Sequence, residues 1–452
     1  MKRSRSAWRY LWTAQDIRRK LLITLGILVL YRLAAHVPVP GVNREAIQTL
    51  LSSGGAGANL INFIDMISGG TVSNFSVLAM GVYPYITAQI ILQLLVPIIP
   101  ALQRKMEEDP REGRKWQERW TYILSIPMAA LNAFGQIQIY SNYAGLSIIP
   151  GFGFGASADV LKSVTILLSM TAGTMFAIWL GELISEYGIR NQGLSLIIFS
   201  GIIARIPQNF GQIFLNEEGR WVLLAFMVVL TVLTVFAIVF VQQGRRNIPV
   251  IYPGRRVGRR MSMPVESTLP LMVNMAGMIP LIFAQAILQF PNLVASFFIG
   301  SENEGVANFA VNAQQFFDPS GPWYWVFYFL MVVLFAFFYT DVLFAQQNYG
   351  ENLKRVGARI KGVSPGAPTQ RYLTKVLRRI TFPGALFLGI VAVLPYLSQI
   401  IVSTMNLGGV NSSALLVSSA GLLIVVGTVR DTFFNIEAEL KIHGYEDSLL
   451  VR

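Results

Sequence analysis

Few side chains in this sequence have the type and spacing needed to make or break covalent bonds. Cysteine is absent, which excludes disulfides, thiolate metal sites and cysteine nucleophiles, and the two histidines are His36 and His443. No segment is similar to a serine-hydrolase, metalloprotease or nucleotide-binding motif. The sequence therefore predicts a protein that is not an enzyme and that holds neither a metal nor a cofactor.

Basic side chains on two long polar segments could bind phosphate or acidic groups. Residues 242–267 contain six arginines, and residues 346–379 contain eight lysines and arginines. One interpretation is topological, since cytoplasmic loops retain basic residues that also attract anionic lipids. The other is a docking surface for an acidic or nucleic-acid partner, contacted through phosphates. The proline, glycine and aromatic content predicts ordered, projecting loops in either case.

Glycine and proline interrupt the apolar sequence at two places. Residues 64–86 read IDMISGGTVSNFSVLAMGVYPYI, and residues 275–280 read MAGMIP. Because glycine costs about 1 kcal/mol and proline about 3 kcal/mol inside a helix, each break is either an ordinary kink or backbone that lines a cavity. Polar residues in these regions, such as Thr87 and Asn274, form helix–helix hydrogen bonds or serve a function.

The elements that would position these features are membrane-spanning helices. The chain of 452 residues is 53% hydrophobic and only 13% charged, which predicts an all-α polytopic membrane protein. The basic N-terminus and the apolar run Leu21–Tyr31 are interpreted as a retained first span. Ten spans are predicted, at residues 21–37, 75–99, 119–141, 160–182, 191–213, 220–241, 268–290, 323–345, 379–402 and 414–436.

The distribution of basic residues predicts the orientation of these spans. With ten spans, 31 of the 36 lysines and arginines fall on one side, which places both termini in the cytoplasm. Residues 1–215 and 216–452 each contain five spans, so the two halves are expected to be inverted relative to each other, as in many transport proteins. Ionisable residues such as Glu182 and Asp341 lie toward span ends, which argues against a proton- or sodium-coupled solute transporter.

Eight motifs, taken in order, resemble those of the SecY family, whose members form the central channel of the bacterial protein translocase. The resemblance extends over essentially the whole chain. The motifs are PVPGVN at 38–43, SGG at 68–70, GVYPYITAQIILQLL at 81–95, GTMFAIWLGE at 173–182, GLSLIIFSGI at 193–202, LPLMVNMAGMIPLIFAQAIL at 269–288, NLKRVGA at 352–358 and LLIVVGTVRDT at 422–432.

The resemblance implies two inverted five-helix halves around a central, hourglass-shaped pore. It implies a plug half-helix at about residues 60–74, including Phe63, Ile64, Met66, Ile67, Gly69 and Gly70. It implies an aliphatic pore ring of Val82, Ile86, Leu194, Ile198, Ile279, Ile282 and Ile424. Thr87 and Asn274 would face a lateral gate between the second and seventh spans. Partner-docking residues would be Arg255, Arg256, Arg259, Arg260, Lys354, Arg355, Arg359 and Lys361.

The family also implies a function and partners. The function is a passive channel in the cell membrane that translocates unfolded secretory polypeptides and releases membrane segments laterally. Its partners would be SecE, SecG, the SecA ATPase, the ribosome (through rRNA contacts with the basic loops), signal sequences, nascent polypeptides and membrane lipids. The sequence departs from the family at Ser364, where an arginine is usual before Pro-Gly, and at Met272, where a lysine is common. The alternative function is an inverted-repeat solute transporter.

Overall fold

The computed structural model describes residues 15–43, 75–144, 148–153, 159–215, 220–253, 256–257, 260–261, 263–298, 303–317, 321–404 and 419–442. Most of these residues are helical. The helices are α2 (Gln15–Ala34), α5 (Tyr83–Ile98), α6 (Pro100–Glu108), α7 (Pro110–Ala144), α8 (Val160–Tyr187), α9 (Gly193–Leu215), α10 (Arg220–Gln243), α11 (Ile279–Phe298), α12 (Glu304–Phe316), α13 (Pro322–Gln346), α14 (Tyr349–Arg355), α15 (Ala367–Thr404) and α16 (Ser419–Ile442). The strands are β1 (Arg245–Tyr252), β2 (Arg256–Val257), β3 (Arg260–Met261), β4 (Val265–Met272) and β5 (Arg359–Ile360).

Each of the ten predicted spans overlaps one of the long helices. Among the described residues, four helical segments are long and apolar enough on their own to cross a membrane, and they belong to α8, α10, α13 and α15. The pair α5 and α6 meets the same criterion together but bends by 95° at the junction. The mostly helical body agrees with the predicted class, while the full count of ten spans and the inverted halves stay predictions.

Two predicted spans begin later than expected. The span predicted at 268–290 starts as a strand, because β4 pairs antiparallel with β1 from Val265 to Met272 and α11 begins only at Ile279. The span predicted at 75–99 starts with turns, and α5 begins at Tyr83. Gly81 has a φ of 52°, a conformation that glycine adopts without strain, and Pro84 fits the first turn of the helix.

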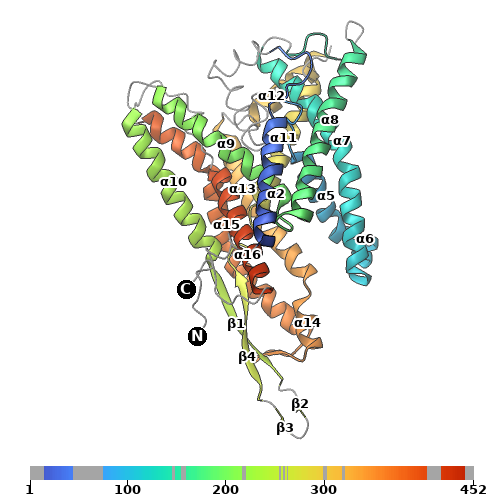
Figure 1. The fold of residues 1–452 in the computed structure, drawn as a ribbon, viewed down its shortest axis with the longest axis vertical. Helices are drawn as coiled ribbons and strands as arrows, with labels where there is room; N and C mark the ends of the chain where they lie inside the picture. Colours follow the sequence, from blue (N-terminus) through green and yellow to red (C-terminus); the bar gives the residue numbers. More distant parts are fainter. Residues whose placement is uncertain are drawn as a thin grey trace.

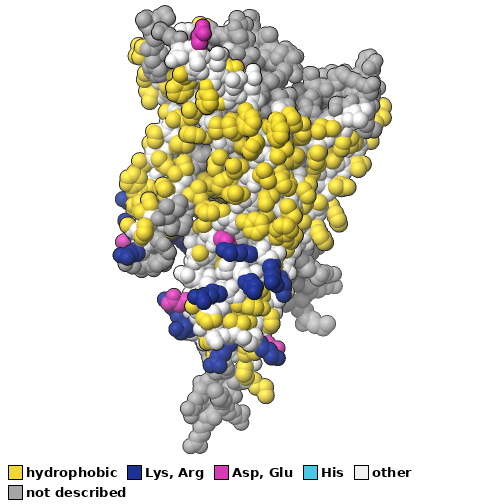
Figure 2. Space-filling view, turned by 180° about the vertical axis from the view of Figure 1, so that it is seen from behind, with side chains coloured by type: hydrophobic (Ala, Val, Ile, Leu, Met, Phe, Trp, Pro, Cys, Tyr) yellow, Lys and Arg dark blue, Asp and Glu magenta, His cyan; other side chains and the backbone are white. Residues whose placement is uncertain are grey.

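The long helices run lengthwise through the molecule, and a β-hairpin projects from one end (Figure 1). β1 and β4 form that hairpin, α14 lies beside it, and α12 lies at the opposite end. In the face drawn in Figure 2, hydrophobic side chains form a broad band, and lysine and arginine side chains gather below it, at the hairpin end. This separation of apolar band and basic end is typical of a membrane protein with one basic side.

Glycines allow the closest helix contacts. A Cβ atom added at Gly193, where α9 begins, would lie 1.7 Å from the carbonyl oxygen of Gly181 in α8. A Cβ at Gly173 would lie 2.1 Å from the carbonyl oxygen of Val77, in the turns before α5. Small residues let backbones approach in this way in membrane bundles. α8 is thereby held against the starts of both α5 and α9.

Candidate pore, gate and docking surface

The first two candidate ring residues flank the start of α5. Val82 is the residue before the helix and is buried, and Ile86 follows one turn later. The Ile86 amide donates to the carbonyl of Val82 at 3.2 Å. The turns before Val82 are anchored to residues 37–39, since the Val77 amide donates to the carbonyl of Val37 at 2.9 Å. The backbone break at the start of α5 therefore has a defined geometry.

Leu194 and Ile198 occupy successive turns at the start of α9. The close approach of Gly193 to Gly181 sets this start against α8. The hydroxyl of Ser185, one turn further along α8, accepts a hydrogen bond from the Gly193 amide at 3.1 Å. Gly193, the first residue of the GLSLIIFSGI motif, therefore sets the position of Leu194 and Ile198 relative to α8.

The seven candidate ring residues come from four helices and lie in two adjoining hydrophobic clusters. One cluster contains Val82, Ile198 and Ile424 (in α16) as buried members, with Ile86 and Leu194 packed against it. The other contains Ile282 (in α11) as a buried member, with Ile279 and Ile86 packed against it. Ile86 contacts both clusters and joins them. These residues therefore form one continuous apolar contact between α5, α9, α11 and α16.

The two candidate gate residues are buried, but each makes its hydrogen bonds within its own turn. The Thr87 hydroxyl donates to the carbonyl of Pro84 at 2.9 Å. The Asn274 carboxamide accepts from the Gly277 amide at 3.0 Å and donates to the Gly277 carbonyl at 3.2 Å, which closes the turn that precedes α11. Gly277 has a φ of 64°, which suits glycine at this tight turn. Asn274 therefore shapes the MAGMIP break.

The candidate plug residues Phe63, Ile64, Met66, Ile67, Gly69 and Gly70 lie outside the described residues. The segments on either side of them are described, and they meet. Pro38 and Ser76 form an antiparallel bridge, and the Val39 amide donates to the carbonyl of Phe75 at 3.0 Å. The PVPGVN motif thus holds the start of the second predicted span.

The two basic segments form one structural unit, which we call the docking module: β1, β4, β5, α14 and the first three turns of α15. β1 pairs with β4 along the hairpin and with β5 through Val250–Ile360 and Ile251–Arg359, so the strand order is β4-β1-β5. The module has a hydrophobic core in which Ile248, Val250, Leu271, Leu353, Ala358, Ile360, Leu373, Val376 and Leu377 are buried, and Phe344 of α13 packs into the same core. Most of the described residues of the two segments lie in strands and helices, which agrees with the ordered loops that their composition predicted.

Four of the candidate docking residues project from this module. Lys354 and Arg355 end α14, Arg359 lies on β5, and Lys361 follows β5, all with exposed side chains. Arg355 pairs with Glu351 at 3.3 Å, an exposed contact that contributes little to stability. Arg256 and Arg260 lie on the paired strands β2 and β3 near the tip of the hairpin, while Arg255 and Arg259 lie outside the described residues.

Comparison with known proteins identifies the family. The SecY family model matches residues 76–433. The chain belongs to the SecY family. It is 35% identical over 442 residues to the protein translocase subunit SecY of Streptomyces scabiei, and 38% identical over 439 residues to that of Mycobacterium bovis; each alignment covers 96% of this chain and 97% of the relative. The resemblance inferred from the eight motifs is thus confirmed.

Two solved structures share the fold of this SecY-family chain. One is the structure of a protein-conducting channel, with a TM-score of 0.58, 17% identity, and coverage of 99% of this chain and 100% of that chain. The other concerns the plug domain of the SecY protein, which is described as stabilising the closed state of the translocation channel and maintaining a membrane seal. Its TM-score is 0.59, with 18% identity and the same coverage.

The structure places both departures from the usual SecY pattern in the docking module. Ser364 is exposed in the turn before α15, and its carbonyl oxygen accepts from the Thr369 hydroxyl at 2.8 Å. Met272 is the last residue of β4, where it pairs in register with Arg245. Both are surface positions, so the departures change what a partner would contact rather than the core.

Two features were not predicted from the sequence: the packing of Met278 beside the ring residues and the pairing of β5 with β1. Met278 packs against the cluster that contains Val82, Ile198 and Ile424, and also against the core formed by α10, α11, α13, α15 and α16. Its place in the MAGMIP break was a usable signal, because the turn that ends at Gly277 brings it beside the ring residues. The β5 pairing had no local signal, since two residues do not form a recognisable strand pattern.

Proposed function

We propose that this chain is a passive protein-conducting channel whose narrowest part is the ring of seven aliphatic residues. The observation that carries the proposal is the continuous apolar contact that these residues make between four helices. An apolar constriction blocks ions by dewetting, yet it accepts an extended polypeptide because it makes no specific hydrogen bonds with it. As a member of the SecY family, the chain is a channel subunit and not a catalyst by itself.

The plug belongs to the same proposal. Residues 60–74 act as a plug that seals the pore in the resting channel. Support comes from the bridged flanks, because Pro38–Ser76 brings the chain back beside its point of departure. The segment between can therefore fold into the pore and leave it without moving the helices that bear the ring.

Lateral release takes place between α5 and α11. Ile90 of α5 lies in one apolar cluster with Ala276, before α11, and Phe283 of α11. Thr87 and Asn274 make the hydrogen bonds described above within their own turns, so separating the two helices breaks neither of these bonds. A membrane segment that leaves the pore exchanges one apolar surface for another and then partitions into lipid by its own hydrophobicity.

The force for transport comes from a partner at the docking module. SecA or the ribosome binds there, the ribosome through rRNA phosphates, and SecE and SecG complete the channel in the cell membrane with both termini of this chain in the cytoplasm. Support comes from the exposed cations Lys354, Arg355, Arg359 and Lys361, which project from a module with its own core. A folded module with a packed core can pass the force of a bound partner to the channel, whereas an unstructured loop would bend.

The proposal is tested by reconstituting the chain with SecE, SecG and SecA in lipid vesicles. A secretory precursor added outside should become protected from protease when ATP is present. The matched control carries Ile198→Lys, a charge in the ring that should prevent passage without altering the docking module. Uptake of a small solute without protection of the precursor would contradict the proposal and favour a solute transporter.

A further inference from the structure

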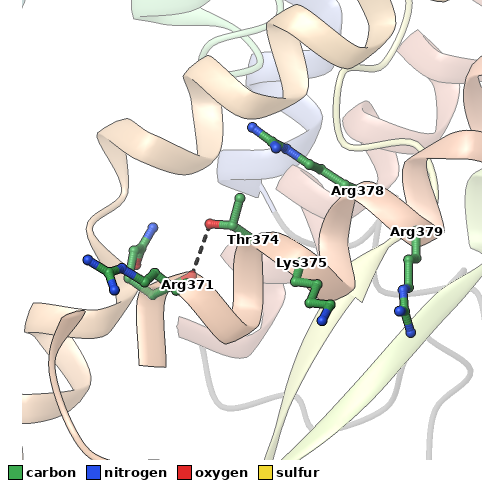
Figure 3. A pocket seen from close by; sticks show the side chains of 6 residues that line it. Arg371, Thr374, Lys375, Arg378 and Arg379 are labelled. Carbon is green, nitrogen blue, oxygen red and sulfur yellow. Dashed lines mark hydrogen bonds between the residues drawn. The ribbon is translucent and has the colours of Figure 1, made fainter. Parts of the chain in front are cut away.

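A basic hollow lies on the first four turns of α15, mostly within the docking module but outside the ring and apart from the candidate docking residues. It is lined by Gln370, Arg371, Thr374, Lys375, Arg378 and Arg379, and we call it the basic patch. None of its lining residues is acidic. Figure 3 shows Lys375 and Arg379, one turn apart, pointing to the same side of α15, while Arg378 points away from them.

The cations of the basic patch are poorly neutralised by the protein. Arg378 pairs with Asp341 of α13 at 2.9 Å. Among the described residues, Arg371, Lys375 and Arg379 form no ion pair, and their spacing of four residues places like charges next to each other, which destabilises a helix. Such a cluster is stabilised when an anion with several oxygen atoms lies between the cations.

The Arg378–Asp341 pair marks where the apolar surface of two neighbouring helices ends. Phe338, one turn before Asp341 on α13, is 38% exposed, and Phe382, one turn after Arg378 on α15, is 55% exposed. Ile390 and Leu397, further along α15, are also exposed. Figure 2 shows the same transition from the apolar band to basic side chains on the face that it draws. These exposed apolar side chains face lipid when the chain spans a membrane.

The distance of each cation from that boundary, measured along α15, indicates which anions lie at the same depth as the basic patch. Residues rise about 1.5 Å each along a helix, so Lys375 lies about 4–5 Å beyond Arg378 and Arg371 about 10 Å beyond it. The headgroup layer of a leaflet is about 5–8 Å thick. Lys375, Arg378 and Arg379 therefore lie within the headgroup layer, whereas Arg371 lies about 2–5 Å beyond it. Lipid phosphates occupy this layer already.

We propose that the basic patch binds the phosphate headgroup of an anionic phospholipid in the leaflet on the hairpin side, with Lys375 and Arg379 as the main contacts. The acyl chains lie along the exposed apolar face of α15 that begins at Phe382. The inference rests on the chain spanning a membrane and not on its conducting polypeptides. A bound lipid at this place neutralises cations on the α15 part of the docking module.

The test uses a fluorescent reporter beside the site. Phe382→Trp is reconstituted in phosphatidylcholine vesicles with brominated phosphatidylglycerol or brominated phosphatidylcholine, and the quenching of the added tryptophan is measured against the parent chain. The reporter should be quenched preferentially by phosphatidylglycerol. Lys375→Gln with Arg379→Gln, in the same background, should reduce that preference by up to about fivefold per charge removed. High salt should reduce it as well.

The matched control is Lys354→Gln with Lys361→Gln, which removes the same charge from the docking module away from the apolar band. It should leave the preference unchanged. If the reporter substitution prevents folding, native mass spectrometry of the otherwise unaltered chain counts retained phosphatidylglycerol, which should fall with Lys375→Gln and Arg379→Gln. An unchanged preference would overturn the proposal. The proposal would also be overturned if Lys375→Gln with Arg379→Gln abolished ribosome binding in lipid-free detergent but left the lipid preference intact. That result would assign the patch to a macromolecular partner.

Discussion

Replacing Ile86 and Ile198 with alanine should make the resting channel leak ions. These residues lie on α5 and α9, and Ile86 is the residue that joins the two clusters of the ring. Opening the pore must separate the helices that the ring holds together. Because the contact is apolar, its loss favours the open state without removing any hydrogen bond of the gate.

The size of the effect follows from burial. Ile198 is 6% exposed, so its truncation removes three buried carbon atoms, about 2.5 kcal/mol at about 0.8 kcal/mol per carbon, and a residual cavity adds to this. If this contact is lost on opening, the ratio of open to closed channels rises about 60-fold, since 1.4 kcal/mol corresponds to a factor of ten. Ile86 is half-buried and contributes less, and because the two residues share a cluster their effects are not additive.

The assay is ion conductance of the purified channel in planar bilayers, without precursor or SecA. Ile86→Ala and Ile198→Ala should each raise the resting conductance, and the double variant should raise it further. Ile123→Ala is the control, because Ile123 is 49% exposed on α7 and the substitution removes the same atoms. Conductance as low as that of the parent in both ring variants would refute the ring assignment.

Three further predictions concern packing, the link between the chain ends and docking. Gly193→Ala should lower the free energy of unfolding in detergent by several kcal/mol, because the new Cβ would lie 1.7 Å from a carbonyl oxygen. Gly26→Ala is the control and should leave that free energy unchanged, since its new Cβ would have no atom within 4 Å. Lys20 and Glu439 form an ion pair between α2 and α16. A double-mutant cycle on the free energy of unfolding should give a coupling of about 1 kcal/mol, and zero coupling would contradict a stabilising role for the pair. Ile360→Asn should displace β5 and abolish SecA binding while the resting ion conductance stays that of the parent; intact binding would contradict the role of the docking module.

Much of the helical body could be predicted because membrane spans carry a strong, local signal. Apolar segments about 20 residues long, bounded by charge, overlap the helices that the structure contains. The starts of α5 and α11 could not be placed, because hydropathy does not distinguish an apolar turn or strand from a helix. The segment VESTLPLM of β4 is a strand only because β1, earlier in the chain, pairs with it.

Contacts between distant residues were beyond reach of the sequence alone. Lys20 and Glu439 are 419 residues apart, and no periodicity relates them. The basic patch likewise needs the end of α13, because Asp341 shows where the apolar surface stops and which arginine is paired. The ring residues could be named in advance only because the motifs resemble a known family, since aliphatic residues at their spacing occur in every span.

Contact between the aliphatic ring and a translocating polypeptide can be measured directly, because the chain contains no cysteine. Single substitutions Ile86→Cys, Ile282→Cys and Ile424→Cys are combined with a precursor that carries one cysteine and is arrested during transport by a folded domain. Oxidation should produce a disulfide between the precursor and each ring position, whereas Ile123→Cys, on the exposed face of α7, should give none. Cross-links that are absent from the ring, or no stronger there than at residue 123, would contradict the account.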